Sequence, residues 1–152
     1  MTPITARAAS DRRSTLSSAV DLLPSPEAWL AAAAHHGELF AQLDPGVRIA
    51  LLARTAPTQM LVWEADDAGV DARIEPFADY AASAADIVLA ADDEWLSEVR
   101  SAAAARLFEV LRGGVRSGHI VCYLLRRRCV LEERGLEEML DALGFAFMGA
   151  CR

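Results

Sequence analysis

Lysine and asparagine are both absent from the 152-residue sequence, so all fifteen basic residues are arginines. Without lysine the chain can offer no Schiff base, no lysine general base and no lysine-dependent phosphate loop. Its formal net charge is −7 and its pI is about 4.9. A chain of this charge repels nucleic acids and anionic lipid surfaces unless one face is locally basic. We therefore expect no nucleic-acid partner.

Long apolar runs are also missing. No stretch approaches the ~20 apolar residues that cross a bilayer, and the N-terminus has no signal-peptide core of about 7–15 apolar residues. The three cysteines, Cys122, Cys129 and Cys151, are an odd number, which favours reduced thiols over a disulfide framework. These features predict a cytoplasmic protein with no integral membrane segment.

The composition divides the chain into a short tail and one domain. Residues 1–21 mix Ser, Thr, Ala and Arg with little periodicity and carry net positive charge, which predicts a flexible N-terminal tail. Residues 22–152 are long enough to bury one core, so we expect a single α+β domain there. Thirty alanines inflate the hydrophobic content of 53%, and large apolar side chains are correspondingly few.

Helical and strand periods alternate along this domain. A helix is predicted over about 26–43, because Ser25 can cap it and Pro26 suits its first position. A second helix is predicted from the cap Asp92 to Gly113-Gly114. Between the helices lie four segments with the length or alternation of strands: 47–54, 59–64, 70–76 and 85–90.

Two details set the expected architecture. Pro76 places the third strand at a sheet edge. Residues 119–133 are ambiguous between strand and helix, and we favour a strand over 119–126, followed by a short helix over 136–143. The fold class expected is therefore α+β, with a mostly antiparallel sheet of about five strands covered by helices.

Residue patterns indicate no self-contained catalytic or metal site, and we predict no cofactor. The adjacent His35 and His36 project about 100° apart on a helix and do not form an i, i+4 ligand pair. Asp92 is explained by helix capping. Ser117 lies near His119 but lacks the G-x-S-x-G elbow of a nucleophilic serine.

The expected partner is an apolar small molecule, and a homodimer is left open. Large apolar residues on the strands, the connecting loop and the second helix are candidates to line a pocket, with core packing as the alternative. They are Trp63, Phe77, Tyr80, Trp95, Val99, Phe108 and Leu111. Arg112, Arg116 and Arg126 are candidate contacts for an anionic headgroup, and a solvated face is their alternative.

A family resemblance rests on the order of a helix, the strand segments 47–54, 59–64 and 70–75, and two further segments. Residues 85–96, Ala-Asp-Ile-Val-Leu followed by Asp92-Asp93-Glu94-Trp95-Leu96, resemble the alanine–aspartate strand and acidic helix cap of the sterol carrier protein-2 family. Residues 111–118 are similar to the family's later glycine-bracketed strand, although His119 replaces its Asp or Asn. The resemblance covers about 26–143. It implies a helix-covered sheet enclosing an apolar tunnel for a lipid, sterol or acyl-CoA-like ligand, without catalysis.

Three functions follow as hypotheses. The first is a noncatalytic carrier of a hydrophobic small molecule. The second is an isomerase or cyclase similar to nuclear transport factor 2, using Asp86 or Asp92 with Tyr80, which a buried carboxylate of raised pKa would favour. The third is a regulatory subunit that binds through C-terminal apolar residues, namely Leu136, Met139, Leu140, Leu143, Phe145, Phe147 and Met148.

Overall fold

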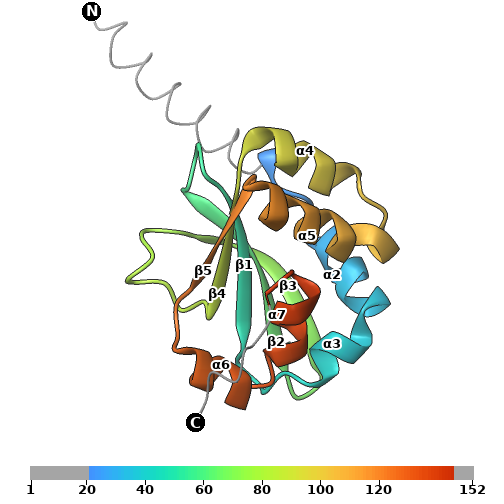
Figure 1. The fold of residues 1–152 in the computed structure, drawn as a ribbon, viewed down its shortest axis with the longest axis vertical. Coiled ribbons are helices and arrows are strands. Elements are labelled where there is room, and N and C mark those ends of the chain that lie inside the picture. Colours follow the sequence, from blue (N-terminus) through green and yellow to red (C-terminus); the bar gives the residue numbers. More distant parts are fainter. Residues whose placement is uncertain (1–20, 146–152) are drawn as a thin grey trace, which may run out of the picture.

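The computed structural model describes residues 21–145 of the chain (Figure 1). Its strands are β1 (Arg48–Ala53), β2 (Gln59–Asp66), β3 (Gly69–Pro76), β4 (Ile87–Ala91) and β5 (Ile120–Leu124). Its helices are α2 (Pro26–His35), α3 (Gly37–Ala41), α4 (Asp93–Ser101), the 3₁₀ turn η1 (Ala104–Arg106), α5 (Leu107–Ser117), α6 (Arg128–Glu133) and α7 (Glu137–Ala142).

The five strands form one mixed sheet in the order β3-β2-β1-β4-β5. Neighbouring strands are antiparallel except for β1 and β4, which run parallel. The predicted α+β class with a mostly antiparallel five-stranded sheet is confirmed, with one parallel pair that was not foreseen. β3, which ends at Pro76, lies at an edge of the sheet as predicted.

Helices cover one face of this sheet (Figure 1). Alternate residues of the strands point into that layer, including Ile49, Leu51, Trp63 and Leu89, and all are buried. They meet apolar residues of every helix, from Trp29 on α2 to Leu140 on α7. The main core therefore lies between the sheet and the helices, as amphipathic layers require.

The opposite face carries a second, smaller core. Leu52, Val62 and Val88 alternate with the first set along their strands and are fully buried. Phe77 and Tyr80, in the 77–86 connection between β3 and β4, pack against this group. An irregular segment therefore covers part of the face that has no helix.

The first predicted helix is wrong in its length, because the chain forms two helices instead of one over 26–43. Ser25 caps α2 as predicted, accepting a hydrogen bond from the Ala28 N–H at 3.1 Å. At His36 the backbone leaves helical geometry, with φ −115° and ψ 39°. The bend lets Phe40 on α3 reach the ring of Trp63, with 4.9 Å between centroids.

The second predicted helix is also divided. α4 ends at Ser101, and α5 continues through the two glycines that were expected to stop it. Gly114 instead allows a close approach, because a Cβ built there would stand 2.4 Å from Trp95 Nε1. The indole N–H of Trp95 donates to Val110 O on α5 at 2.8 Å, which fixes α4 against α5.

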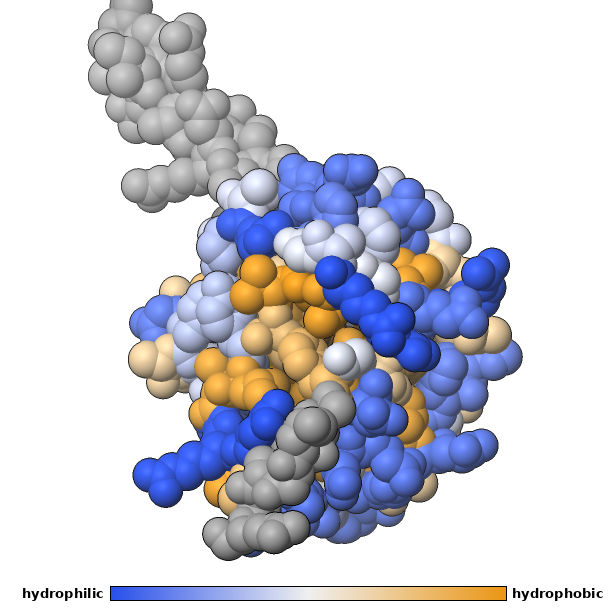
Figure 2. Space-filling view, viewed as in Figure 1, coloured by the Kyte–Doolittle hydropathy of each residue, from blue (hydrophilic) through white to orange (hydrophobic). Residues whose placement is uncertain are grey.

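The ambiguous segment contains both structures. Residues 120–124 form β5, as favoured, and residues 128–133 form α6. Figure 2 shows apolar side chains at the surface in the centre of the view, where β5 lies beside α5 in Figure 1. Half-buried Cys122 and Leu124 on β5 and Val115 on α5 are at the margin of the main core here.

The C-terminal helix is a core element. Leu136, Met139, Leu140 and Leu143 are each at most 1% exposed, so they do not form the partner surface that the third hypothesis needed. They are covered because they pack into the main core with residues of the sheet and of the other helices. Phe147 and Met148, which completed that surface, lie outside the described residues.

Two further expectations concern the membrane and the cysteines. Within residues 21–145 we find no helix with the length and hydropathy to span a bilayer. Cys122 is a free thiol, and burial raises its pKa to about 12. The prediction of reduced thiols therefore holds for Cys122, and Cys151 lies outside the described residues.

Candidate functional site

Trp63 lies in a stack of aromatic rings. Its indole is parallel to that of Trp29, with 3.7 Å between centroids, and to the ring of Phe108, at 5.9 Å. The Trp63 N–H donates to Trp29 O at 2.7 Å, so its polar atom is satisfied within the core. Two of the predicted pocket residues, Trp63 and Phe108, are therefore core residues in contact with each other.

The remaining predicted pocket residues are distributed over both faces of the sheet. Phe77 and Tyr80 lie on the other face of the sheet, where Tyr80 packs against Tyr123 at 4.2 Å. Burial, followed by the neighbouring Tyr123, raises the pKa of the Tyr80 hydroxyl. The others belong to the helical layer, where Val99 and Leu111 are buried and Trp95 packs between α4 and α5. The seven side chains do not meet in one cavity.

The three predicted headgroup arginines lie in two places. Arg112 and Arg116 on α5 both lie beside Gly144, within 4.0 Å of where its Cβ would be. Arg126 follows β5 and stands 3.6 Å from Asp86 Oδ1. They do not converge on a shared anion site in the described part of the chain.

Asp86 is the buried carboxylate that the enzyme hypothesis invoked. It is 1% exposed, and both of its oxygens have partners: Oδ1 accepts from the guanidinium of Arg134, and Oδ2 accepts from the Arg48 backbone N–H at 2.9 Å. Tyr80 is not among these partners. The contacts of Asp86 bind the end of α6 to the sheet.

Asp92 forms a contact that the sequence did not reveal. It caps α4 by accepting from the Trp95 backbone N–H at 2.8 Å, and its other oxygen lies 2.6 Å from His119 Nδ1. Burial raises the pKa of Asp92, but these two hydrogen bonds and the charge of Arg54 outweigh it, so the pKa is lowered overall. The His119 ring stacks on Trp95 at 4.8 Å. An aspartate–histidine pair therefore joins the start of α4 to the start of β5.

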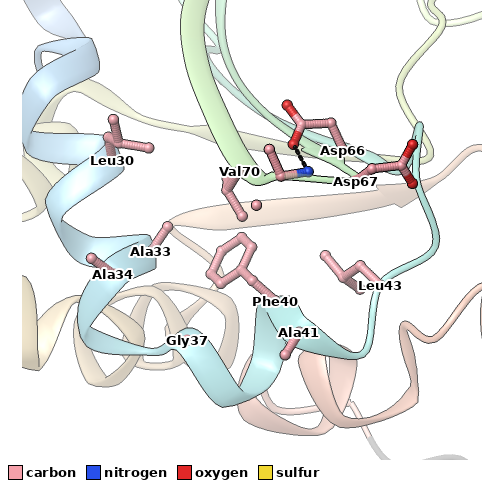
Figure 3. Close-up of a pocket in the computed structure, with 12 residues that line it drawn as sticks. Leu30, Ala33, Ala34, Gly37, Phe40, Ala41, Leu43, Asp66, Asp67 and Val70 are labelled. Carbon is pink, nitrogen blue, oxygen red and sulfur yellow. Dashed lines mark hydrogen bonds between the residues drawn. The ribbon is translucent and has the colours of Figure 1, made fainter.

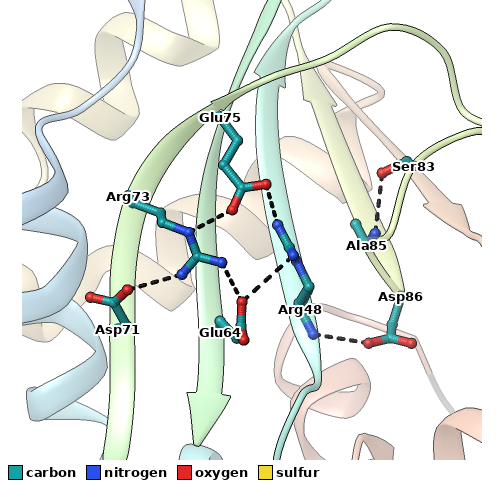
Figure 4. A network of polar contacts seen from close by, with 8 residues as sticks. All are labelled: Arg48, Glu64, Asp71, Arg73, Glu75, Ser83, Ala85 and Asp86. Atoms are coloured by element: carbon teal, nitrogen blue, oxygen red, sulfur yellow. Dashed lines mark hydrogen bonds and ion pairs between the residues drawn. The ribbon is translucent and has the colours of Figure 1, made fainter.

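Charged residues cover part of the face without helices (Figure 4). Arg73 on β3 pairs with Glu64, Asp71 and Glu75, and Arg48 on β1 pairs with Glu64 and Glu75. The hydrogen bond to Glu64 is the main cause that raises the pKa of Arg73. Each of the three carboxylates in this network has an arginine partner, although the two arginines leave one negative charge in excess.

A pocket of about 450 Å³ lies between α2, α3 and the turn from β2 to β3 (Figure 3). Twelve described residues line it, and all are apolar or glycine except the two aspartates of the turn. They are Leu30, Ala33, Ala34, Gly37, Phe40, Ala41, Leu43, Asp66, Asp67, Ala68, Gly69 and Val70. Two other pockets of about 210 and 230 Å³ include Val99 and Phe77 respectively.

The elements that form this pocket follow from local sequence. The bend at His36 sets α2 and α3 at an angle, and the turn at 66–69 closes the third side. Asp66 stabilises that turn by accepting from the Ala68 N–H at 2.9 Å, and Gly69 has φ 144°. The turn joins two segments that the sequence predicted as strands, 59–64 and 70–76, but nothing in the sequence placed it opposite α2.

Comparison with known proteins gives no relative: no protein-family model, curated protein or solved structure matches this chain.

Proposed function

We propose that this chain is a noncatalytic binding module for a hydrophobic small molecule. The observation that carries the proposal is the pocket between α2, α3 and the β2–β3 turn. Its volume of about 450 Å³ falls within the range of about 300–1,000 Å³ typical of small-molecule sites, whereas the two smaller pockets fall below that range. Its mostly apolar lining suits a ligand whose burial contributes about 25 cal/mol per Å².

The exposure of one large apolar side chain supports a binding surface in this pocket. Leu30, on the pocket side of α2, is 41% exposed although it is a large apolar residue. Phe40, which lines the same pocket and is labelled in Figure 3, is buried. A ligand seated on Phe40 would remove the exposed apolar surface of Leu30 from water.

The enzyme alternative has less support from its candidate residues. The cap contact and the lowered pKa of Asp92 count against it as an acid catalyst, since a general acid at neutral pH needs a raised pKa. Asp86 is held in contacts with Arg134 and Arg48.

Other features remain predictions. The resemblance to the sterol carrier protein-2 family suggests a lipid, sterol or acyl-CoA-like ligand. We also propose a cytoplasmic location and a homodimer.

A neutral apolar fluorophore, N-phenyl-1-naphthylamine, tests the proposal. Exposed Ala34 lines the pocket, so Ala34→Trp should fill it and weaken binding by about tenfold or more, which is about 1.4 kcal/mol. Ala31→Trp is the matched control, because Ala31 is also exposed on α2 but lines the 210 Å³ pocket.

We expect saturable binding to the wild type and to Ala31→Trp, and weak binding to Ala34→Trp. Binding that only Ala31→Trp removes would assign the ligand to the smaller pocket. No saturable binding to the wild type, together with no apolar adduct in native mass spectra of freshly purified protein, would refute the binding function.

A further inference from the structure

We infer that the pocket beside α2 selects a cationic amphiphile, a compact apolar body that carries an ammonium group. This ligand class rests on the proposed function, because it describes the same pocket. It differs from the anionic headgroup that the arginine-rich segments suggested.

The charge at the pocket is negative. Asp66 and Asp67 lie at its rim on the β2–β3 turn, and Figure 3 shows the Asp67 carboxylate at the end nearest Leu43. Both aspartates are exposed, and no described residue that lines the pocket is basic. A cation at the rim would therefore meet two carboxylates without displacing an arginine.

The net charge of the chain acts in the same direction as the two aspartates. α2 ends at His35 and α3 begins at Gly37, so a negative and a positive end of helix dipoles lie together beside the pocket and largely offset each other. The net charge of −7 raises the local concentration of cations around the whole molecule. An anionic ligand would be opposed by the two aspartates and by this net charge.

The apolar part of the ligand has its own place. The ring of Phe40 lies between Ala33 and Leu43 in Figure 3, with Val70 of β3 on the opposite side. This lining offers no basic group that could neutralise a buried anion. The apolar body of the ligand would therefore lie against the apolar lining, and its positive charge would lie beside the aspartates of the turn.

Three probes that share a naphthalene ring but differ in charge test the ligand class independently of the binding function. They are 1-naphthylmethylammonium, 1-naphthalenemethanol and 1-naphthoate, titrated against the full chain at low salt with ring fluorescence as the readout. Since an exposed ion pair is weak, we expect the cation to bind about three- to tenfold more tightly than the alcohol, and the anion to bind most weakly. The preference should disappear at about 1 M salt, where the screening length is about 3 Å.

The double variant Asp66→Asn/Asp67→Asn should remove the preference and leave alcohol binding unchanged. An asparagine oxygen can still accept the Ala68 N–H, so the turn is retained. Glu94→Gln/Glu98→Gln makes the same change in net charge at exposed positions on α4 and should preserve the preference.

The other outcomes are distinct. If the alcohol binds and the cation binds no more tightly, or if the α4 control removes the preference equally, the ligand class is overturned and the binding function stands. If none of the probes binds, the binding function fails. Affinities that fall as protein concentration rises, with a dimer in light scattering, would show a second copy in the pocket and overturn the inference.

Discussion

Asp86 and Arg134 are 48 residues apart in the sequence, and the carboxylate of the first accepts a hydrogen bond from the guanidinium of the second. Asp86 is 1% exposed at the start of β4, and Arg134 follows α6. A buried carboxylate is stable only when it is paired and hydrogen-bonded. This pair therefore fixes the C-terminal helices on the sheet.

Replacement of Asp86 should destabilise the fold substantially. Asp86→Asn leaves Arg134 without its counter-charge, and we expect a loss of about 2–3 kcal/mol, below the usual range for fully buried pairs because Arg134 is 29% exposed. Urea unfolding followed by circular dichroism measures it. Asp141→Asn, at an exposed position on α7, should change stability by less than about 0.5 kcal/mol. Equal losses in the two variants would contradict a structural role for the pair.

The approach of Trp95 to Gly114 makes a second prediction. A Cβ at Gly114 would also stand 2.6 Å from the Ile120 side chain, so Gly114→Ala must displace an aromatic ring or a strand. Overpacking of this kind costs about 1–3 kcal/mol. At Gly37 a Cβ meets nothing within 4 Å, so Gly37→Ala should leave stability unchanged or raise it by up to about 1 kcal/mol. Thermal unfolding of both variants tests whether space, rather than backbone freedom, requires the glycine.

Because of Asp92, the free energy of unfolding should fall at acid pH. Its pKa is lowered in the folded state from the ordinary value of 3.8, so its ionised form stabilises the fold above that value. This contribution is lost as the pH falls through the folded pKa. We expect the wild type to be more stable than Asp92→Asn at pH 6 and the difference to shrink steadily below about pH 4. A constant difference across urea titrations at several pH values would show that the charge is not involved.

Cys122 should be nearly inert towards alkylation in the folded protein. Burial raises its thiol pKa to about 12, and only the thiolate reacts. At pH 8 we expect carboxymethylation by iodoacetate to be about 100-fold slower than in guanidinium, where the thiol is exposed. Peptide mass mapping identifies the modified residue. Rapid modification without denaturant would show that β5 opens readily.

Local signals in the sequence were sufficient for most individual elements. Ser25 and Asp92 cap helices as expected, and the Asp66–Gly69 turn joins two strands. Caps, turn residues and strand alternation depend on neighbours in the chain, so they can be read without the fold. Sequence signals did not locate the break in the first helix at His36. They also misread Gly113 and Gly114 as a helix end, because these glycines make room for the indole of the distant Trp95.

The candidate site shows the same division. The sequence by itself determined the acidic turn at 66–69, the apolar faces of the helices and the negative net charge. Only the tertiary structure decided that Trp63 and Phe108 would stack in the core, that His119 would reach Asp92, and that α2 would lie opposite the β2–β3 turn. These relationships join segments 27 or more residues apart. They depend on how layers pack around a shared core, which short-range sequence patterns do not encode.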